Sequence, residues 1–235
     1  MSRFTILFDN RPNDGGFPTL WGFSCFIETP EATLLFDTGS NGRVLLQNMA
    51  RLGVDLRKAE ALFISHPHWD HIGGLDSVVE ANPRLRLFVP DSLSKHLVRD
   101  LRGLVDGVTV IGGDPVKVMP DIYSTGVMGE IGEQSAVIDL GESIAVVTGC
   151  AHPGVVTIAE RAMTMTGKPI SLLMGGFHLL NADMARIAEV VESLRDLGVR
   201  RVCPTHCSGD LAVTMFAEAF GTRCLTGGTG RVIEA

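Results

Sequence analysis

The chain has 235 residues, a net charge of −7 and a hydrophobic content of 45%, which is enough apolar material for a sizeable core. No run of lysine or arginine is present that could follow a phosphate backbone, and no apolar stretch reaches the roughly 20 residues that cross a bilayer. The N-terminal residues lack the apolar region of a signal peptide. The cysteines, five in number, show no framework spacing. We therefore expect a cytoplasmic protein with reduced thiols, a small-molecule substrate, and neither nucleic acid nor membrane as a partner.

Apolar runs rich in Phe, Ile, Leu and Val predict strands, and amphipathic stripes that end at glycine predict helices. In the first half we expect strands at 3–8, 22–28, 33–37, 61–65 and 84–90, and helices at 42–52 and 91–103, the latter capped by Asp91 or Ser92. In the second half we expect strands at 108–113, 116–119, 135–140, 143–149, 170–176, 201–206 and 230–234. Helices are expected at 157–165, 182–197 and 211–220, and a glycine-containing loop at 120–134.

Strands followed by a helix thus recur in two halves, without a linker or a repeat. This organisation favours an α/β protein whose helices cover the faces of sheets. Spacing alone does not distinguish a doubly wound sheet from a layered sandwich.

The most informative segment is HPHWDH at 66–71, which holds three of the seven histidines and an aspartate. His66 and His68 are two residues apart, so on an extended segment their side chains point the same way. Asp70 and His71 follow after a bend that the glycine pair at 73–74 would ease. Imidazole and carboxylate suit zinc, iron, manganese or nickel. Four such ligands close together favour two ions over one.

Three further histidines each follow an apolar strand: His152 in VVTGCAHPG, His178 in LLMGGFH and His206 in VCPTHCSG. Strand ends followed by loops are where α/β proteins build their sites. The remaining histidine, His96, lies inside a helical pattern, and we interpret it as a surface residue.

Several cysteines lie beside these histidines. Cys150 is two residues before His152, and Cys203 and Cys207 flank His206. A thiolate is a reasonable metal ligand, whereas small buried thiols are also common in cores. The sequence leaves both roles open.

Five segments, FDTG at Asp37, HPHWDHIGGL, TGCAHPG, GGFHL and PTHCSG, resemble in this order the motifs of the metallo-β-lactamase superfamily. They are most similar to its branch of metal-dependent hydrolases, which includes the dihydropterin–ribofuranosylaminobenzene 5′-phosphate synthase-like proteins. The resemblance implies an αββα sandwich of two mixed sheets flanked by helices. It also implies that residues 1–235 form a single domain.

The resemblance implies a ligand set in which a first metal ion is bound by His66, His68 and His152, and a second by Asp70, His71 and His206. Asp37 would lie behind these ligands as an acceptor that orients them. Most of the superfamily has an aspartate that bridges both ions after the strand that here reads SLLMGG. This chain has Gly175, Gly176, Phe177 and His178 there. His178 would bind one ion, contact the substrate, or leave the site with one ion held firmly.

These implications lead to the hypothesis of a metal-dependent hydrolase that activates water against a small ester, phosphoester or related substrate, with Asp70 and His178 as catalytic residues. Zinc is the expected metal, one or two ions per chain, with manganese, iron or nickel as alternatives. Trp21, Trp69 and Phe177 are candidate substrate contacts, although the tryptophans could equally pack a loop. Other hypotheses are a pterin-type transferase and a mononuclear-metal redox or binding protein. The sequence indicates no oligomeric state.

Overall fold

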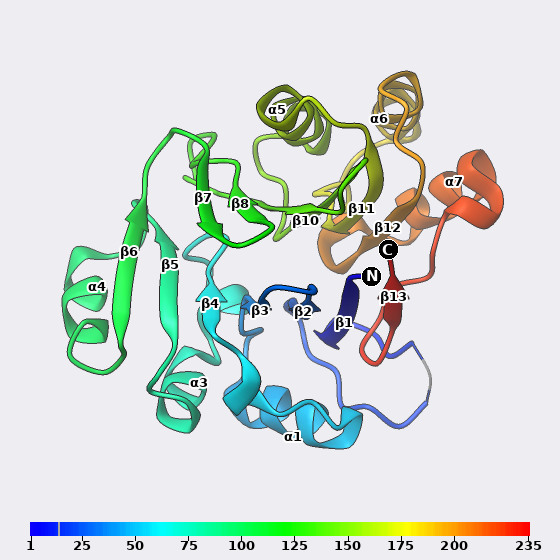
Figure 1. The fold of residues 1–235 in the computed structure, drawn as a ribbon. Helices are drawn as coiled ribbons and strands as arrows, with labels where there is room; N and C mark the ends of the chain where they lie inside the picture. Colours follow the sequence, from blue (N-terminus) through cyan, green and yellow to red (C-terminus); the bar gives the residue numbers. More distant parts are fainter. Residues whose placement is uncertain (14) are drawn as a thin grey trace.

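The computed structural model describes residues 1–13 and 15–235. Two β-sheets face each other, and helices cover the outer side of each sheet (Figure 1). The αββα sandwich predicted from the motif resemblance is therefore confirmed, and the doubly wound sheet is excluded.

The first sheet has seven strands, and one of them, β4 (Ala61–Phe63), leads into the histidine motif. In spatial order they are β13 (Val232–Glu234), β1 (Arg3–Phe8), β2 (Ser24–Glu28), β3 (Thr33–Phe36), β4 (Ala61–Phe63), β5 (Arg86–Pro90) and β6 (Gly107–Ile111). Strands β3 to β6 run parallel to one another, whereas the pairs on the β13 side of β3 are antiparallel.

The second sheet has six strands. In spatial order they are β12 (Val202–Thr205), β11 (Ile170–Gly176), β10 (Ile144–Thr148), β9 (Ala136–Asp139), β8 (Ile122–Ser124) and β7 (Val116–Met119). Strands β10, β11 and β12 are parallel, so the segments that follow all three leave the sheet at the same edge.

The helices lie outside the two sheets. Those on the first sheet are α1 (Gly42–Leu52), α2 (Trp69–Ile72), α3 (Leu75–Ala81) and α4 (Lys95–Leu101); those on the second are α5 (Val155–Thr166), α6 (Met184–Asp196) and α7 (Asp210–Phe220). Short 3₁₀ turns occur at Leu56–Lys58, His206–Ser208 and Gly221–Arg223. Among the described residues, no helix combines the length and the apolar character that crossing a membrane requires.

Alternation along the strands builds three apolar layers. In β3, Leu34 and Phe36 face the core between the sheets, and Leu35 faces the helices α1 and α3. In β10, Ala145 and Val147 face the central core, and Val146 faces the helices of the second sheet. Both faces of the central strands are buried, which explains why these strands appear in the sequence as continuous apolar runs.

Three local predictions were wrong or incomplete. The helix predicted to begin after Asp91 or Ser92 begins at Lys95, with Ser94 at the N-cap position. The short helix α3 was not predicted, because it has only seven residues and includes two adjacent valines, which are weak helix formers. The predicted loop at 120–134 contains the strand β8, which pairs with both β7 and β9.

Candidate metal centre

The histidines named above gather at one edge of the sandwich. His66 and His68 follow β4, His152 follows β10, His178 follows β11, and His206 follows β12. Two triads have their ligand atoms within 4.8 Å of one another: His66, His68 and His152, and Asp70, His71 and His206. The geometry thus brings together the same two sets that the motif resemblance implies, from strands of both sheets.

In four of the imidazoles, Nδ1 lies within hydrogen-bond distance of a residue that belongs to neither triad. These are His66, His71, His152 and His206. In the first sheet, Asp37 Oδ2 accepts from His71 Nδ1 at 2.6 Å and from Ser65 Oγ at 2.6 Å. Ser65 Oγ in turn lies 2.9 Å from His66 Nδ1. Asp37 directly follows β3 and has a positive φ of 53°, so its backbone turns sharply beneath the histidine motif.

The second sheet supports its histidines through Glu133, a residue that the sequence analysis did not identify. The buried carboxylate of Glu133 accepts from the backbone N–H groups of Cys150, Ala151 and His152 at 2.8–2.9 Å. It also lies 2.7 Å from His152 Nδ1. Asn10 does the same for His206, with Oδ1 3.0 Å from Nδ1 and Nδ2 donating to the backbone carbonyl at 2.9 Å.

These contacts favour a proton on Nδ1 of each of the four rings, so that Nε2 carries no proton and can act only as an acceptor. A proton on Nδ1 leaves Nε2 of His66, His71, His152 and His206 free to bind a cation. His66 Nε2 and His68 Nδ1 face each other at 3.1 Å. His206 Nε2 is buried without a hydrogen-bond partner among the described residues, although Asp70 Oδ2 lies 3.3 Å away. Ring nitrogens and a carboxylate oxygen that converge in this way fit a divalent metal ion.

The electrostatics of the site favour the same protonation state. Burial and the neighbouring His71 lower the pKa of His66 to about 3, and burial and His206 lower the pKa of His71 to about 3. Both rings are therefore neutral at pH 7, which is the form that binds metal. Burial opposes the charge of Asp70, but the nearby His206 and His71 hold its pKa below the ordinary value. Asp70 is therefore a carboxylate.

Two buried carboxyl groups behind the ligands differ in their titration. Burial opposes the charge of Glu133, but the hydrogen bonds from the side chain and backbone of His152 hold its pKa at about 2. Burial raises the pKa of Asp37 to about 7, although His66 and Ser65 act in the opposite direction. Glu133 receives more hydrogen bonds, which explains why it keeps its charge at full burial.

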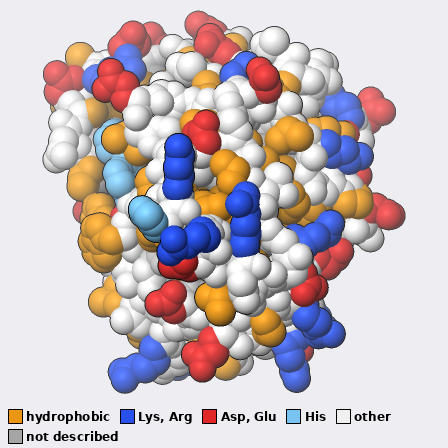
Figure 2. Space-filling model, turned by 90° about the vertical axis from the view of Figure 1, so that its left-hand side faces the viewer, with side chains coloured by type: hydrophobic (Ala, Val, Ile, Leu, Met, Phe, Trp, Pro, Cys, Tyr) orange, Lys and Arg blue, Asp and Glu red, His pale blue; other side chains and the backbone are white. Residues whose placement is uncertain are grey.

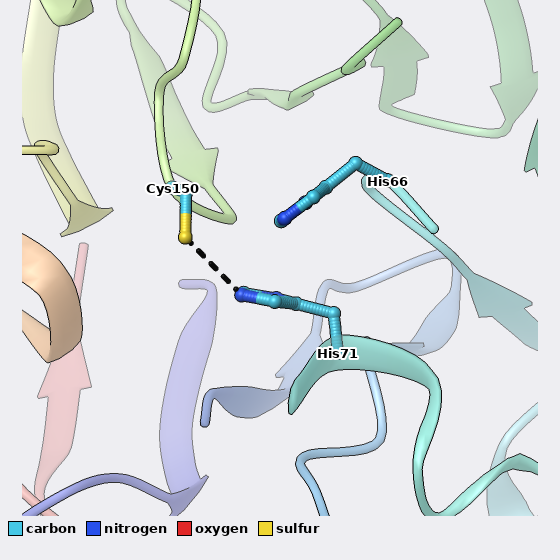
Figure 3. Close-up of side chains that lie close together, drawn as sticks. All are labelled: His66, His71 and Cys150. Atoms are coloured by element: carbon cyan, nitrogen blue, oxygen red, sulfur yellow. Dashed lines mark hydrogen bonds between the residues drawn. The ribbon is translucent and has the colours of Figure 1, made fainter. Parts of the chain in front are cut away.

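Two thiols lie among the ligands. Cys150 Sγ is 3.3 Å from His71 Nε2 and points with His66 and His71 into the same space (Figure 3). Cys207 Sγ donates to the backbone carbonyl of Cys150 at 3.5 Å. Cys203, in contrast, is fully buried in the core between the sheets. Of the two roles that the sequence leaves open for it, its position fits core packing.

His178 lies at the rim of the site. Its ring centroid is 4.5 Å from that of His152, and Cys207 raises its pKa. A hollow of about 430 Å³ is lined by Trp21, His178, Leu180, Asn181, Ala182 and Cys207. A second hollow of about 210 Å³ includes His152, Phe177, His178 and Arg186. His178 is thus shared by both.

The three aromatic residues predicted to contact substrate differ in exposure. Trp21 is 40% exposed, and its ring centroid is 5.2 Å from that of His206. Trp69 is 63% exposed, on the first turn of α2. Phe177 is only 2% exposed and packs against Phe216, with 5.4 Å between ring centroids. Substrate contact by all three stays a prediction.

His96 is exposed on α4, as predicted, and belongs to none of the ligand groups among the described residues. The face over α4 carries basic side chains interspersed with acidic ones (Figure 2).

The metallo-beta-lactamase superfamily model matches residues 22–206. The chain therefore belongs to the metallo-beta-lactamase superfamily, whose members bind metal ions.

Three relatives sharpen this placement. The chain is 28% identical to 7,8-dihydropterin-6-methyl-4-(beta-D-ribofuranosyl)-aminobenzene-5′-phosphate synthase of Methanocaldococcus jannaschii, over 92% of this chain and 90% of that one. It is 25% identical to a metal-dependent hydrolase of the beta-lactamase superfamily, with a TM-score of 0.83 over 100% of this chain and 99% of that one. The metallo-beta-lactamase fold protein YhfI of Bacillus subtilis shares the fold, with 16% identity, a TM-score of 0.73 and full coverage of both chains.

Proposed function

We propose that the chain is a metal-dependent hydrolase of a small ester, phosphoester or related substrate. The observation that carries this proposal is the convergence of two ligand triads in which four of the five histidines have Nδ1 held from behind. These residues fit divalent ions, since five imidazoles and one carboxylate converge. Zinc, at one or two ions per chain, is the metal we expect.

These residues would hold a metal ion, which would supply Lewis acidity for a substrate oxygen and lower the pKa of a water molecule towards about 7. Asp70 would accept a hydrogen bond from the attacking water and orient it, because its carboxylate lies beside both His71 and His206. His178 would donate a proton to the leaving group, because it lines both hollows next to His152.

The hollow of about 430 Å³ would accept the substrate body. Its size falls within the range of small-molecule sites. Trp21 would cover one side of a bound ring, since it is partly exposed beside His206.

The experiment pairs metal analysis with activity. The purified chain is loaded with zinc, and hydrolysis is measured on phosphoester, lactone and thioester panels. In His68→Ala we expect a loss of about 10³-fold or more in kcat/KM, because removing a metal ligand removes several kcal/mol of transition-state stabilisation. His96→Ala is the matched control and keeps full activity. Full activity in His68→Ala would contradict the proposal.

A second candidate, a pterin-type transferase, is favoured by the 28% identity to the methanogen synthase over nearly the whole length of both proteins. The same residues would then activate a leaving group instead of water. Product analysis with and without an added aromatic amine acceptor separates the two functions. A coupled product points to the transferase, and hydrolysis products in both samples point to the hydrolase.

A further inference from the structure

The end of β11 leaves no room for a side chain between the two triads. A Cβ atom at Gly176 would lie 2.4 Å from the carbonyl oxygen of Gly149 and 2.6 Å from Cys207 Sγ. A Cβ atom at Gly175 would lie 2.1 Å from the carbonyl oxygen of Thr148. These contacts are shorter than packed atoms tolerate, so a side chain that binds both ions cannot stand at either glycine of β11. The Gly149 carbonyl after β10 and Cys207 Sγ after β12 fill the space beside Gly176.

Cys150, on the segment after β10, has its sulfur close to members of both triads. Its Sγ lies within 4.8 Å of donor atoms of His66 and His152 from the first triad, and of His71 and His206 from the second. Figure 3 shows the approach to His66 and His71, with Sγ between strands of opposite sheets. An atom at this place can reach two ions at once.

The position of Cys150 is fixed by its surroundings. The residue is 4% exposed, and its backbone N–H donates to Glu133 Oε1 at 2.9 Å. His71, which faces the sulfur at 3.3 Å, is itself held by Asp37. The buried and unpartnered Nε2 of His206 belongs to the same group as Cys150. Near the sulfur, His206 Nε2 thus lacks a hydrogen-bond partner among the described residues, whereas His71 Nε2 has Cys150 itself as its partner.

The net charge of the ligands also favours a further anionic ligand in this site. The two triads supply five imidazoles and the single carboxylate of Asp70. Two divalent ions in a buried site would leave a large uncompensated positive charge, which is costly in a low-dielectric interior. A thiolate at Cys150 adds a negative charge where both ions would feel it.

We propose that Cys150 is a bridging ligand whose Sγ binds both metal ions as a thiolate. This inference rests on the proposed metal-dependent function. On binding, the S–H bond is replaced by bonds from sulfur to the metal ions, and the proton leaves to solvent.

Cys207 does not share this geometry. Its Sγ groups only with Cys150 and His206, and it donates to the carbonyl oxygen of Cys150. Cys224 belongs to none of the ligand groups among the described residues and is half-buried. Cys224→Ser is therefore a matched control for the loss of a thiol.

The test is a titration of the metal-free, reduced chain with cobalt(II), followed by absorption spectroscopy. Thiolate-to-cobalt charge transfer absorbs in the near ultraviolet, where imidazole and carboxylate ligands contribute little. We expect this band to change over both the first and the second equivalent of cobalt. It should persist in Cys224→Ser and disappear in Cys150→Ser. The wild-type titration stands by itself if Cys150→Ser does not fold.

Each outcome decides the question. Cobalt bound without a sulfur band overturns the thiolate ligand and leaves the metal-dependent function intact. A band that saturates at the first equivalent while a second ion binds overturns the bridge. A band that survives in Cys150→Ser assigns it to another thiol and overturns the inference as well. No cobalt binding at all in the wild type overturns the proposed function together with this inference.

Discussion

The two halves of the site are built differently. The first sheet delivers four ligands from one short segment, HPHWDH, and holds two of them through Asp37 and Ser65. The second sheet delivers its histidines singly, after three different strands, and holds two of them, His152 and His206, through Glu133 and Asn10.

This difference shows what orients the ligand side chains in each half of the site. In the first half, local chain geometry brings the ligands together, and the support lies within 34 residues in sequence. In the second half, Asn10 reaches His206 across 196 residues, so only the closed sandwich can orient that ring. Four changes would test this contrast, in order of expected effect.

The largest effect is expected at the rim of the second half. In His178→Gln we expect kcat to fall by about 10²-fold or more, because a proton donor to the leaving group is lost. Metal content should stay at the wild-type value, measured by elemental mass spectrometry on the same sample. A loss of metal together with activity would instead make His178 a ligand.

The second effect concerns acid stability. The folded pKa of Glu133 is about 2, below its unfolded value of 4.5. The unfolded chain therefore binds more protons between these values, so the stabilisation is present above pH 4.5 and is lost as the pH falls towards 2. The difference corresponds to about 3 kcal/mol. Urea unfolding of metal-free protein should show a weaker acid dependence in Glu133→Gln, and an unchanged dependence would contradict the assignment.

The third effect compares the two supports directly. Asp37→Asn and Glu133→Gln should each lower metal affinity by about 10- to 100-fold, since partners of metal ligands contribute that much. Asp37 contacts His71 of the second triad directly and reaches His66 of the first through Ser65, whereas Glu133 contacts His152 of the first. Competition titrations with a chelator should thus show both ions weakened in Asp37→Asn and only the first ion weakened in Glu133→Gln. Equal weakening of both ions in each variant would remove the distinction between the halves.

The smallest effect is expected at Trp69, which lies inside the histidine motif but is 63% exposed. Trp69→Ala should change the free energy of unfolding by less than about 0.5 kcal/mol, as is usual for exposed positions. If Trp69 contacts substrate, KM rises while metal content stays constant. Thermal unfolding and steady-state kinetics on one preparation measure both quantities, and Trp21→Ala provides the comparison near His206.

The sequence by itself determined much of this protein. The period of apolar residues located nearly all strands and the longer helices, because each strand is buried on one or both faces and the helices bury one stripe. Helix α1 matches its predicted range because Asn41 caps its start and Gly53, at a φ of 68°, ends it. The density of HPHWDH and the recurrence of histidines after strands indicated the candidate ligands, and the motif resemblance implied their division into two triads.

The tertiary structure alone decided the rest. Glu133 lies in a glycine-containing loop with no sequence signal, and it matters only because the fold carries that loop onto the backbone of Cys150 and His152. Asn10 became a partner of His206 through contact between the two ends of the chain. The place of Cys150 likewise depends on Gly176 of the neighbouring strand, where a Cβ atom would lie 3.1 Å from the Cα of Cys150. Such contacts join residues far apart in sequence, and local pattern carries no information about which distant segments will meet.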